Sequence, residues 1–481
     1  MMRTLFLQAP SFDGYDGGAG ARYQMKREVR SFWYPTWLAQ PAAMVEGSKL
    51  IDAPAHDLSW DAIKHEVDDR DLVILHTSTP SFRQDVHTAE LIKARKPGIQ
   101  IGFIGAKVAV ESEKALASSP AIDWVARNEF DYTCKEIADG MPLSEVKGIS
   151  YRDDRGEIVH NPDRAMIENM DDLPFVSPIY KRDLTIEKYF GGYLKHPYVS
   201  FYTGRGCKSR CTFCLWPQTV GGHNYRTRSI AHVIEEVKYV LNEMPTVKEI
   251  FFDDDTLTDN LPRVEELSVA LGQLGFGKPG FGISWSCNAK ANVPRKTLEI
   301  MKAGGCRLLL VGYESGNQQI LHNIKKGLRV DVARQFTKDC HDLGIVIHGT
   351  FILGLPGETL ETIEETIEYA KEINPHTIQV SLAAPYPGTF LYKQAVENNW
   401  FDGTDHLLTD GGTQIAQLSY PHLPASVIFD KVEEFYKRFY FRPRKIGAIV
   451  GEMVRDFDMM KRRLREGVEF FNFLRNRKEA A

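Results

Sequence analysis

Three cysteines lie within eight residues of one another, in the stretch Cys207-Lys-Ser-Arg-Cys211-Thr-Phe-Cys214. Thiolates are soft ligands that suit zinc ions and iron–sulfur clusters. A structural zinc ion needs a fourth ligand in a closed tetrahedron, and the nearby candidate, His223, lies beyond a glycine-containing loop. Three thiolates on a cluster of four irons instead leave one iron open to another ligand. We therefore expect Cys207, Cys211 and Cys214 to hold a 4Fe-4S cluster, with a zinc site or three incidental thiols as the alternative.

Six strand-like runs alternate with helical patterns in the part of the chain that carries these cysteines. Repeated strand–helix units of this kind predict a partial (β/α)6 barrel, which resembles the eightfold TIM barrel but stays open. Such barrels keep their chemistry at the carboxyl ends of the strands, and the cysteines directly follow the first run. The predicted strands are 198–204, 248–255, 283–288, 307–314, 346–354 and 377–384.

The chain before the barrel also alternates strand-like and helical patterns. This alternation predicts an α/β domain with a doubly wound, Rossmann-like parallel sheet. Its clearest strand-like runs are 4–10, 71–78, 98–106 and 123–127. The predicted organisation is a Rossmann-like domain at 1–145, a connector with a hairpin at 146–194, the partial barrel at 195–400 and a helical C-terminal region at 401–481.

The composition is that of a globular protein, with 43% hydrophobic and 26% charged residues among 481. The formal net charge of −5 argues against a nucleic-acid-binding protein, which usually carries a basic excess. A transmembrane helix is not expected, because the chain has no run of about 18 apolar residues. Seven cysteines, an odd number, do not predict a disulfide framework. Because the N-terminus also lacks a signal-peptide pattern, the cytoplasm is the expected compartment.

The cysteine spacing, with the aromatic residue Phe213 before the third cysteine, resembles the signature of the radical S-adenosylmethionine (SAM) superfamily. The run 351–359 is similar to the I-x-G-x-x-x-E signature of that superfamily at Ile352, Gly354 and Glu358. The resemblance implies that the amino and carboxylate groups of SAM bind the open iron. It also implies that an external one-electron donor, of flavodoxin or ferredoxin type, drives cleavage of SAM to a 5′-deoxyadenosyl radical.

The ends of the other predicted strands add groups that suit SAM binding. Asp253 and Asp254 can accept hydrogen bonds from amino or ribose hydroxyl groups, and Lys290 stands where related enzymes often carry an arginine for the SAM carboxylate. Lysine neutralises a carboxylate but lacks the guanidinium fork. The expected catalytic residues are Tyr313 and Glu314. The residues expected to bind cofactors are Phe213, Asp253, Asp254, Lys290, Glu314, Ser315, Ile352, Gly354, Glu358, Ser381 and Pro387.

The first domain resembles the cobalamin-binding domain that precedes the barrel in a large subgroup of the superfamily. Residues 101–109 and 125–133 stand where that subgroup often has Gly-Gly-x-His and Gly-Glu-Gly-Glu, but both stretches depart from the pattern. The D-x-H-x-x-G motif that supplies a histidine ligand is absent. Asp85 and His87 are spaced similarly, but Glu90 replaces the glycine, so we expect His87 to be a surface residue. Cobalamin binding is therefore left open, without a histidine from this motif.

Over nearly its whole length the chain is similar to the hopanoid-biosynthesis-associated radical SAM family HpnJ, most clearly in residues 6–42. The resemblance implies that the hexose ring of a glycosylated bacteriohopanetetrol is contracted to a cyclopentane, which gives a cyclitol ether. The first alternative is a cobalamin-dependent radical SAM methyltransferase. The second is a non-catalytic iron–sulfur or zinc-binding protein.

The C-terminal residues 431–481 carry fourteen Lys and Arg against eight Asp and Glu, interleaved with aromatic residues. Basic helices with apolar residues can rest on anionic lipid, so peripheral contact with the inner membrane, where a hopanoid glycolipid substrate would reside, is one expectation. The alternative is a helical cap over an open end of the barrel. Both arrangements are compatible with the sequence.

Overall fold

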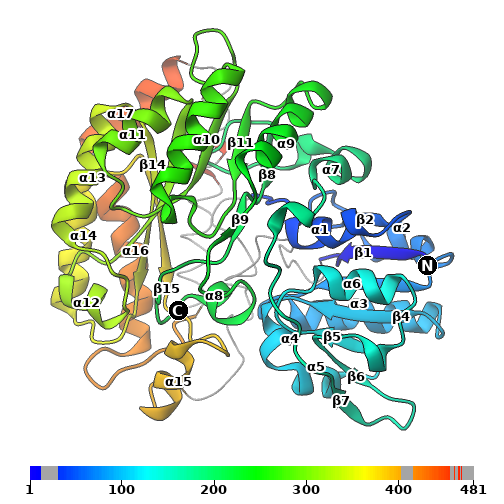
Figure 1. Ribbon diagram of the computed structural model, residues 1–481. Coiled ribbons are helices and arrows are strands. Elements are labelled where there is room, and N and C mark those ends of the chain that lie inside the picture. The colour runs from blue at the N-terminus through cyan, green and yellow to red at the C-terminus, as the bar shows by residue number, and fades with distance from the viewer. Residues whose placement is uncertain (12–30, 402–414, 456–459, 461–463, 466, 469–481) are drawn as a thin grey trace.

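The computed structural model describes residues 1–11, 31–401 and 415–455, together with residues 460, 464, 465, 467 and 468. The chain forms two α/β lobes, each built on its own sheet (Figure 1). This arrangement confirms the predicted fold class, with a Rossmann-like sheet followed by a parallel barrel sheet. Within the described ranges, no helix has the length and apolar character needed to cross a membrane.

The first lobe contains a seven-stranded sheet with the strand order β2-β1-β3-β4-β5-β6-β7. The first five strands in this order pair in parallel, whereas β6 and β7 form an antiparallel hairpin that extends the sheet from β5. The hairpin predicted in the connector therefore belongs to the first sheet. The strands are β1 (Thr4–Gln8), β2 (Lys49–Asp52), β3 (Leu72–His76), β4 (Gln100–Ile104), β5 (Trp124–Ala126), β6 (Ile149–Arg152) and β7 (Ile158–His160).

Helices cover both faces of the first sheet, as the alternating pattern predicts. They are α1 (Thr36–Met44), α2 (Trp60–Ile63), α3 (Phe82–Arg95), α4 (Ala106–Val110), α5 (Ser112–Ser118) and α6 (Asp131–Ala138), and α7 (Ser177–Asp183) lies between the lobes in sequence. His87 is exposed on α3, which agrees with the surface position predicted for it.

The second lobe contains a six-stranded sheet in which every neighbouring pair of strands is parallel, with the order β15-β14-β13-β12-β11-β8. All six predicted strands are present, and the sheet does not close, so the partial barrel is confirmed. The strands are β8 (Tyr198–Phe201), β11 (Glu249–Phe252), β12 (Ser284–Ala289), β13 (Cys306–Glu314), β14 (Val346–Leu353) and β15 (Thr377–Leu382).

Several helices of the second lobe follow a residue whose side chain accepts a hydrogen bond from an amide group of the first turn. The Ser229 side chain accepts from His232 N at the start of α9, and Thr359 and Thr362 form a capping box at the start of α14. The helices are α9 (Ile230–Glu243), α10 (Leu261–Leu274), α11 (Arg295–Ala303), α12 (Gln318–Asn323), α13 (Val330–Asp342), α14 (Leu360–Ile373) and α15 (Phe390–Glu397).

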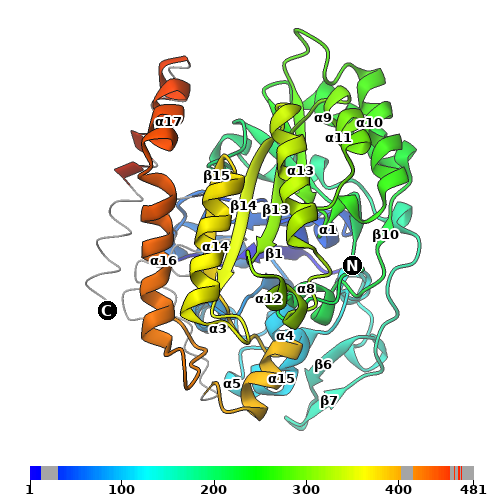
Figure 2. The ribbon, with the colours of Figure 1, turned by 90° about the vertical axis from the view of Figure 1, so that its left-hand side faces the viewer.

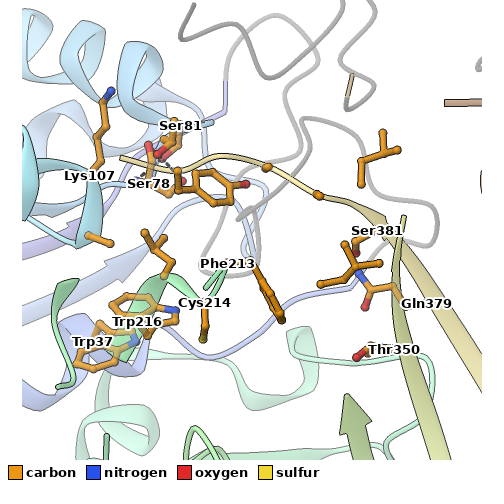
Figure 3. Close-up of a pocket in the computed structure, with 18 of the residues that line it drawn as sticks. Trp37, Ser78, Ser81, Lys107, Phe213, Cys214, Trp216, Thr350, Gln379 and Ser381 are labelled. Carbon is orange, nitrogen blue, oxygen red and sulfur yellow. Dashed lines mark hydrogen bonds between the residues drawn. The ribbon is translucent and has the colours of Figure 1, made fainter. Parts of the chain in front are cut away.

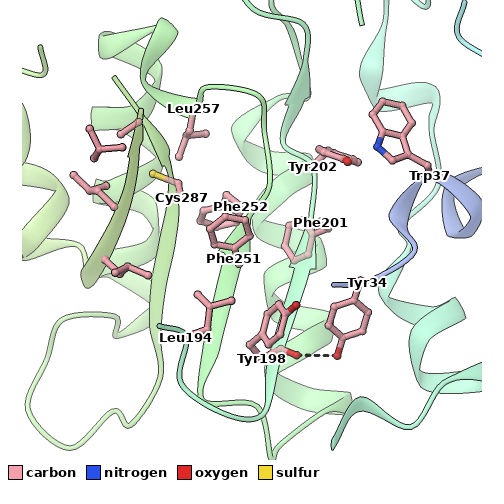
Figure 4. Close-up of a cluster of buried hydrophobic side chains, with 14 of the residues drawn as sticks. Tyr34, Trp37, Leu194, Tyr198, Phe201, Tyr202, Phe251, Phe252, Leu257 and Cys287 are labelled. Carbon is pink, nitrogen blue, oxygen red and sulfur yellow. Dashed lines mark hydrogen bonds between the residues drawn. The ribbon is translucent and has the colours of Figure 1, made fainter. Parts of the chain in front are cut away.

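One aromatic-rich core runs through both lobes and joins them. It includes Tyr34 and Trp37 from the first lobe and Tyr198, Phe201 and Phe251 from the second, all nearly inaccessible to solvent (Figure 4). The Tyr34 hydroxyl donates a hydrogen bond to the Tyr198 carbonyl at 2.8 Å. Because the core is continuous, the carboxyl ends of both sheets are held at a defined separation.

The helix α16 (Ala425–Tyr440) covers the exposed edge of the second sheet, alongside α14 and β15 (Figure 2). The Tyr436 hydroxyl accepts from Val380 N at 2.8 Å, and the Tyr440 hydroxyl accepts from Ile378 N at 2.9 Å. These bonds satisfy amide groups that an edge strand would otherwise leave unpaired. The structure therefore supports a helical cap as one role of the C-terminal region.

The following helix, α17 (Pro443–Arg455), presents three apolar side chains to solvent. Ile446, Val450 and Val454 are 45%, 50% and 80% exposed, and they repeat every fourth residue. Membrane contact through this face stays a prediction. Most of the second basic run, 459–476, lies outside the described residues, as do residues 12–30 of the distinctive opening stretch.

Candidate active site

The three clustered cysteines lie on a buried loop that follows the short strand β9 (Gly204–Arg205) and ends at α8 (Leu215–Thr219). Cys207 and Cys211 are each 7% exposed. The Gln218 side-chain amide donates to the carbonyls of Cys211 at 3.2 Å and Cys214 at 2.7 Å. This amide therefore fixes the backbone of the loop from inside.

The cysteine environment fits an iron–sulfur cluster. Burial raises the pKa of each of the three thiols, and their proximity to one another raises the pKa of Cys211 and Cys214 further. Thiols that are costly to ionise alone are stabilised as thiolates by metal bonds. Among the described residues, no group of three or more His, Cys, Asp and Glu is arranged to hold a single metal ion. Three thiolates on one loop suit a cluster of several irons.

A cavity of about 290 Å³ lies beside Cys214, between the carboxyl ends of the two sheets. Figure 3 shows Ser78 and Lys107 at this cavity on the side of the first lobe, and Gln379 and Ser381 on the strand β15 of the second. This position is the one expected for ligands of parallel sheets. The predicted cofactor-binding residues that line the cavity are Phe213, Asp253, Glu314, Ile352 and Ser381.

Asp254 and Lys290, both predicted to bind cofactors, make other contacts. The Asp254 carboxylate is fully buried and accepts from Thr203 N at 2.6 Å and from the Tyr225 hydroxyl at 2.6 Å. The Lys290 ammonium forms an ion pair with Asp259, whose side chain is 2% exposed. Neither Asp254 nor Lys290 lines the cavity, so the structure assigns both to holding the strand ends in place.

Tyr313 and Ser315 flank Glu314 but point to the helix layer of the barrel. The Tyr313 hydroxyl lies 2.6 Å from Thr337 Oγ1 on α13, and Ser315 Oγ lies 3.1 Å from Thr366 Oγ1 on α14. Successive residues of a strand face opposite sides of the sheet. The structure therefore does not place Tyr313 where a direct role in catalysis requires it.

The run that resembles the I-x-G-x-x-x-E signature forms a closed turn after β14. Gly354 has a φ of +85°, and a Cβ there would lie 3.1 Å from Ile428 Cγ2 of α16. The glycine therefore allows close packing of α16. Glu358 and Gly354 lie outside the cavity lining, and Pro387 is part of the turn that follows Tyr386, which does line the cavity.

The Glu358 carboxyl is fully buried, and its Oε2 accepts from Gly354 N at 2.6 Å and Leu355 N at 3.1 Å. Burial raises its pKa from 4.5 to about 8, against the lowering effect of these amides. Because the pKa of Glu358 is raised in the folded state, its protonated carboxyl contributes to the free energy of unfolding. This contribution is at its full value below pH 4.5 and is lost as the pH rises through about 8.

We therefore expect Glu358→Gln to remove a pH dependence of stability. Between the two pKa values, the free energy of unfolding of the unchanged protein should fall by up to about 1.4 kcal/mol per pH unit, because the carboxyl stays protonated in the fold and loses its proton on unfolding. Thermal unfolding of the cluster-free protein from pH 5 to 9 measures this slope. The exposed Glu361→Gln in the first turn of α14 is the control, and an unchanged slope in Glu358→Gln would contradict the prediction.

An ion pair beside the cysteines was not predicted from the sequence. Lys326 Nζ donates to Glu314 Oε1 at 2.6 Å, and Glu314 takes a left-handed φ of +62° where the register of β13 against β14 shifts. Burial opposes the charge of Lys326, but Glu314 and Cys211 outweigh it and raise the lysine pKa. The positive charge of Lys326 partly offsets the rise in the pKa of Cys211 and Cys214 that burial causes. In the sequence, the feature that could have drawn attention to Lys326 is the turn residue Gly327 directly after it.

Comparison with known proteins identifies the family. A model of the radical SAM superfamily matches residues 201–370. An uncharacterized methyltransferase of Pyrococcus horikoshii is 32% identical over 435 residues, which are 87% of this chain and 90% of that protein. The chain belongs to the radical SAM superfamily. Its cofactors accordingly include SAM and a 4Fe-4S cluster, for which Cys207, Cys211 and Cys214 remain the predicted ligands.

More distant relatives include methyltransferases and a cyclase. Cytidylyl-2-hydroxyethylphosphonate methyltransferase of Streptomyces wedmorensis is 26% identical, over 61% of this chain and 60% of that protein. Anaerobic magnesium-protoporphyrin IX monomethyl ester cyclase of Rubrivivax gelatinosus is 24% identical, over 82% of this chain and 70% of that protein. The resemblance to the hopanoid family gains no support from these relatives.

Two solved radical SAM structures share the two-lobed fold. The methyltransferase TsrM from Kitasatospora setae, with tryptophan and a SAM analogue bound, superposes with a TM-score of 0.67 at 13% identity and covers 92% of this chain and 90% of its own. The enzyme OxsB, with aqua-cobalamin and SAM bound, gives 0.60 at 17% identity and covers 83% of this chain and 55% of its own. The fold is therefore that of the cobalamin-domain subgroup of the superfamily.

Proposed function

We propose that this protein is a cobalamin-dependent radical SAM methyltransferase. The observation that carries the proposal is that residues of both lobes line one cavity. Phe213 and Cys214 reach it from the cluster loop, while Ser78, Ser81 and Lys107 reach it from the carboxyl end of the first sheet. The 32% identity to an uncharacterized methyltransferase over most of both chains supports the same activity.

The carboxyl edge of the first sheet lines the cavity with polar groups, among them Thr77, Ser78 and Ser81. Gly105, at the end of β4, has a φ of +122°, and a Cβ there would lie 2.2 Å from the Thr77 carbonyl. Backbone and small hydroxyl side chains, including Ser78 and Ser81, therefore form this edge. Bound there, cobalamin supplies methyl-carrier chemistry, and SAM supplies the methyl group and the radical. The described residues of the cavity would orient the substrate and exclude water from it.

Ring contraction of a glycosylated bacteriohopanetetrol is the second candidate. What favours it is the neutral hydrogen-bonding group formed by Thr350, Gln379 and Ser381 on one wall of the cavity, which suits a hydroxyl-rich substrate. The hopanoid glycolipid and the flavodoxin- or ferredoxin-type electron donor remain predictions. These two candidates differ in what they do to SAM.

Mass spectrometry of the SAM products distinguishes the two candidates. The protein is reconstituted anaerobically with iron, sulfide and cobalamin, and then mixed with SAM and a reductant. A methyltransferase should form about one equivalent of S-adenosylhomocysteine per bound cobalamin even without substrate, since the methyl group needs only its carrier. Omitting cobalamin is the control. Formation of 5′-deoxyadenosine alone on addition of glycosylated bacteriohopanetetrol, with no S-adenosylhomocysteine at full cobalamin loading, would favour ring contraction instead.

A further inference from the structure

The first lobe holds the cysteine loop of the second lobe at both of its ends. Arg205 lies two residues before Cys207, and Trp216 lies two residues after Cys214. Both side chains contact residues of the first lobe, of which Trp37 also lines the cavity. We call the set of Trp37, Glu129, Asp131, Arg205 and Trp216 the loop clamp.

The upstream end of the loop is held by buried ion pairs. The Arg205 guanidinium is 2% exposed and donates to both oxygens of Asp131, at 2.6 and 3.1 Å. Glu129 lies 3.4 Å from the same guanidinium and also accepts two bonds from Arg226, at 2.7 and 2.9 Å. Arg226 lies opposite Arg205 in the register of the strands β9 and β10 (Arg226–Thr227). Two arginines of this hairpin therefore form ion pairs with two acidic residues.

The two acids belong to the amino-terminal end of α6. Asp131 is the first residue of that helix and Glu129 precedes it by two. Exposed amide groups and the helix dipole stabilise a carboxylate in this position. Because all four charged side chains are buried, their attraction is screened little by solvent. Removal of one partner leaves an uncompensated charge inside the protein.

The downstream end of the loop is held by an aromatic stack. The rings of Trp37 and Trp216 are nearly parallel, with centroids 4.7 Å apart and planes at 8° (Figure 3). The Arg205 guanidinium carbon lies 5.0 Å from the Trp37 ring, a distance typical of a cation–π contact. Trp37 therefore connects the two ends of the cysteine loop through a single side chain of α1.

We propose that Asp131 and Trp37 are positioning residues for the iron–sulfur cluster, acting through Arg205 and Trp216. A buried ion pair contributes little net stability compared with apolar packing, but it selects one geometry. Here that geometry is the path of the loop that carries all three cluster thiolates. The first lobe thus sets the environment of the cluster in addition to forming one wall of the cavity. This inference depends on the cluster and not on the identity of the substrate or of the proposed reaction.

Thiol labelling of the cluster-free protein tests the proposal without turnover. Asp131→Asn should raise the alkylation rates of Cys207, Cys211 and Cys214 by about 5- to 30-fold relative to Cys340, because one or two lost contacts change a local opening equilibrium by that factor. Cys340 is fully buried on α13 and reports global unfolding in the same molecule. Peptide mass spectrometry separates the four sites.

A matched control is Glu236→Gln. Glu236 is fully buried and accepts from Arg228 Nη1 at 2.6 Å, so its loss disturbs a buried ion pair that does not contact the loop. In the reconstituted protein, Asp131→Asn should also change the electron paramagnetic resonance spectrum and midpoint potential of the reduced cluster, and Glu236→Gln should not. If Asp131→Asn does not fold, Trp37→Phe should show the same labelling pattern. Equal loop labelling in the clamp and control variants would overturn the proposal.

Discussion

Cys211→Ala is expected to eliminate the iron–sulfur cluster and to reduce SAM cleavage by more than about 100-fold, since loss of even an outer partner of a metal ligand costs 10- to 100-fold. Cys211 lies between the other two cysteines of the loop and, like Cys207, is buried. Two thiolates leave two irons without protein ligands. Iron and sulfide content after anaerobic reconstitution, with 5′-deoxyadenosine measured by mass spectrometry, gives the result directly.

Cys340→Ala is the matched control for this substitution. Cys340 is also fully buried, and burial raises its pKa, but it lies on α13, in the helix layer of the barrel. Its removal should cost about 1 kcal/mol of stability, typical of a core substitution, and leave iron content unchanged. Normal cluster content in Cys211→Ala, or its loss in Cys340→Ala, would mean that the assigned ligand set is wrong.

Lys326→Met should weaken SAM binding by about 10- to 100-fold, because a hydrogen bond to a charged group contributes 1.5–3 kcal/mol and each 1.4 kcal/mol is tenfold in affinity. Lys326 is a buried cation whose charge acts on Cys211 and Cys214, where the SAM carboxylate is expected. Its loss also leaves the Glu314 carboxylate, 6% exposed, without its partner. Equilibrium binding of SAM to the reconstituted protein measures the effect.

Substitutions of two other lysines, Lys325 and Lys290, test the specificity of this prediction. Lys325→Met changes the next residue, whose ammonium lies over the Phe390 ring at 4.8 Å, and should leave SAM affinity nearly unchanged. Lys290→Met removes the lysine predicted from the sequence, which the structure pairs with Asp259. A larger loss of affinity in Lys290→Met than in Lys326→Met would restore the prediction made from the sequence and contradict the role given to Lys326.

The sequence by itself predicted the cluster ligands, identified the superfamily and placed the six barrel strands along the chain. The cysteines are close in sequence, so their common loop does not depend on the rest of the fold. The six barrel strands are apolar runs separated by helical periods, and this local pattern is preserved in the parallel sheet. Phe213, Asp253, Glu314, Ile352 and Ser381 line one cavity because the strand ends of a barrel converge, and their role in binding cofactors stays a prediction.

Only the tertiary structure decided which polar side chains face the cavity. Asp253 and Asp254 are adjacent in sequence, yet one lines the cavity and the other is buried against Thr203, since consecutive residues point to opposite sides. The ion pair between Lys326 and Glu314 beside the cysteines forms where a left-handed residue ends β13. The contact between Asp131 and Arg205 joins residues 74 positions apart. Such long-range pairings follow from how the two lobes pack, and no local pattern in the chain encodes that packing.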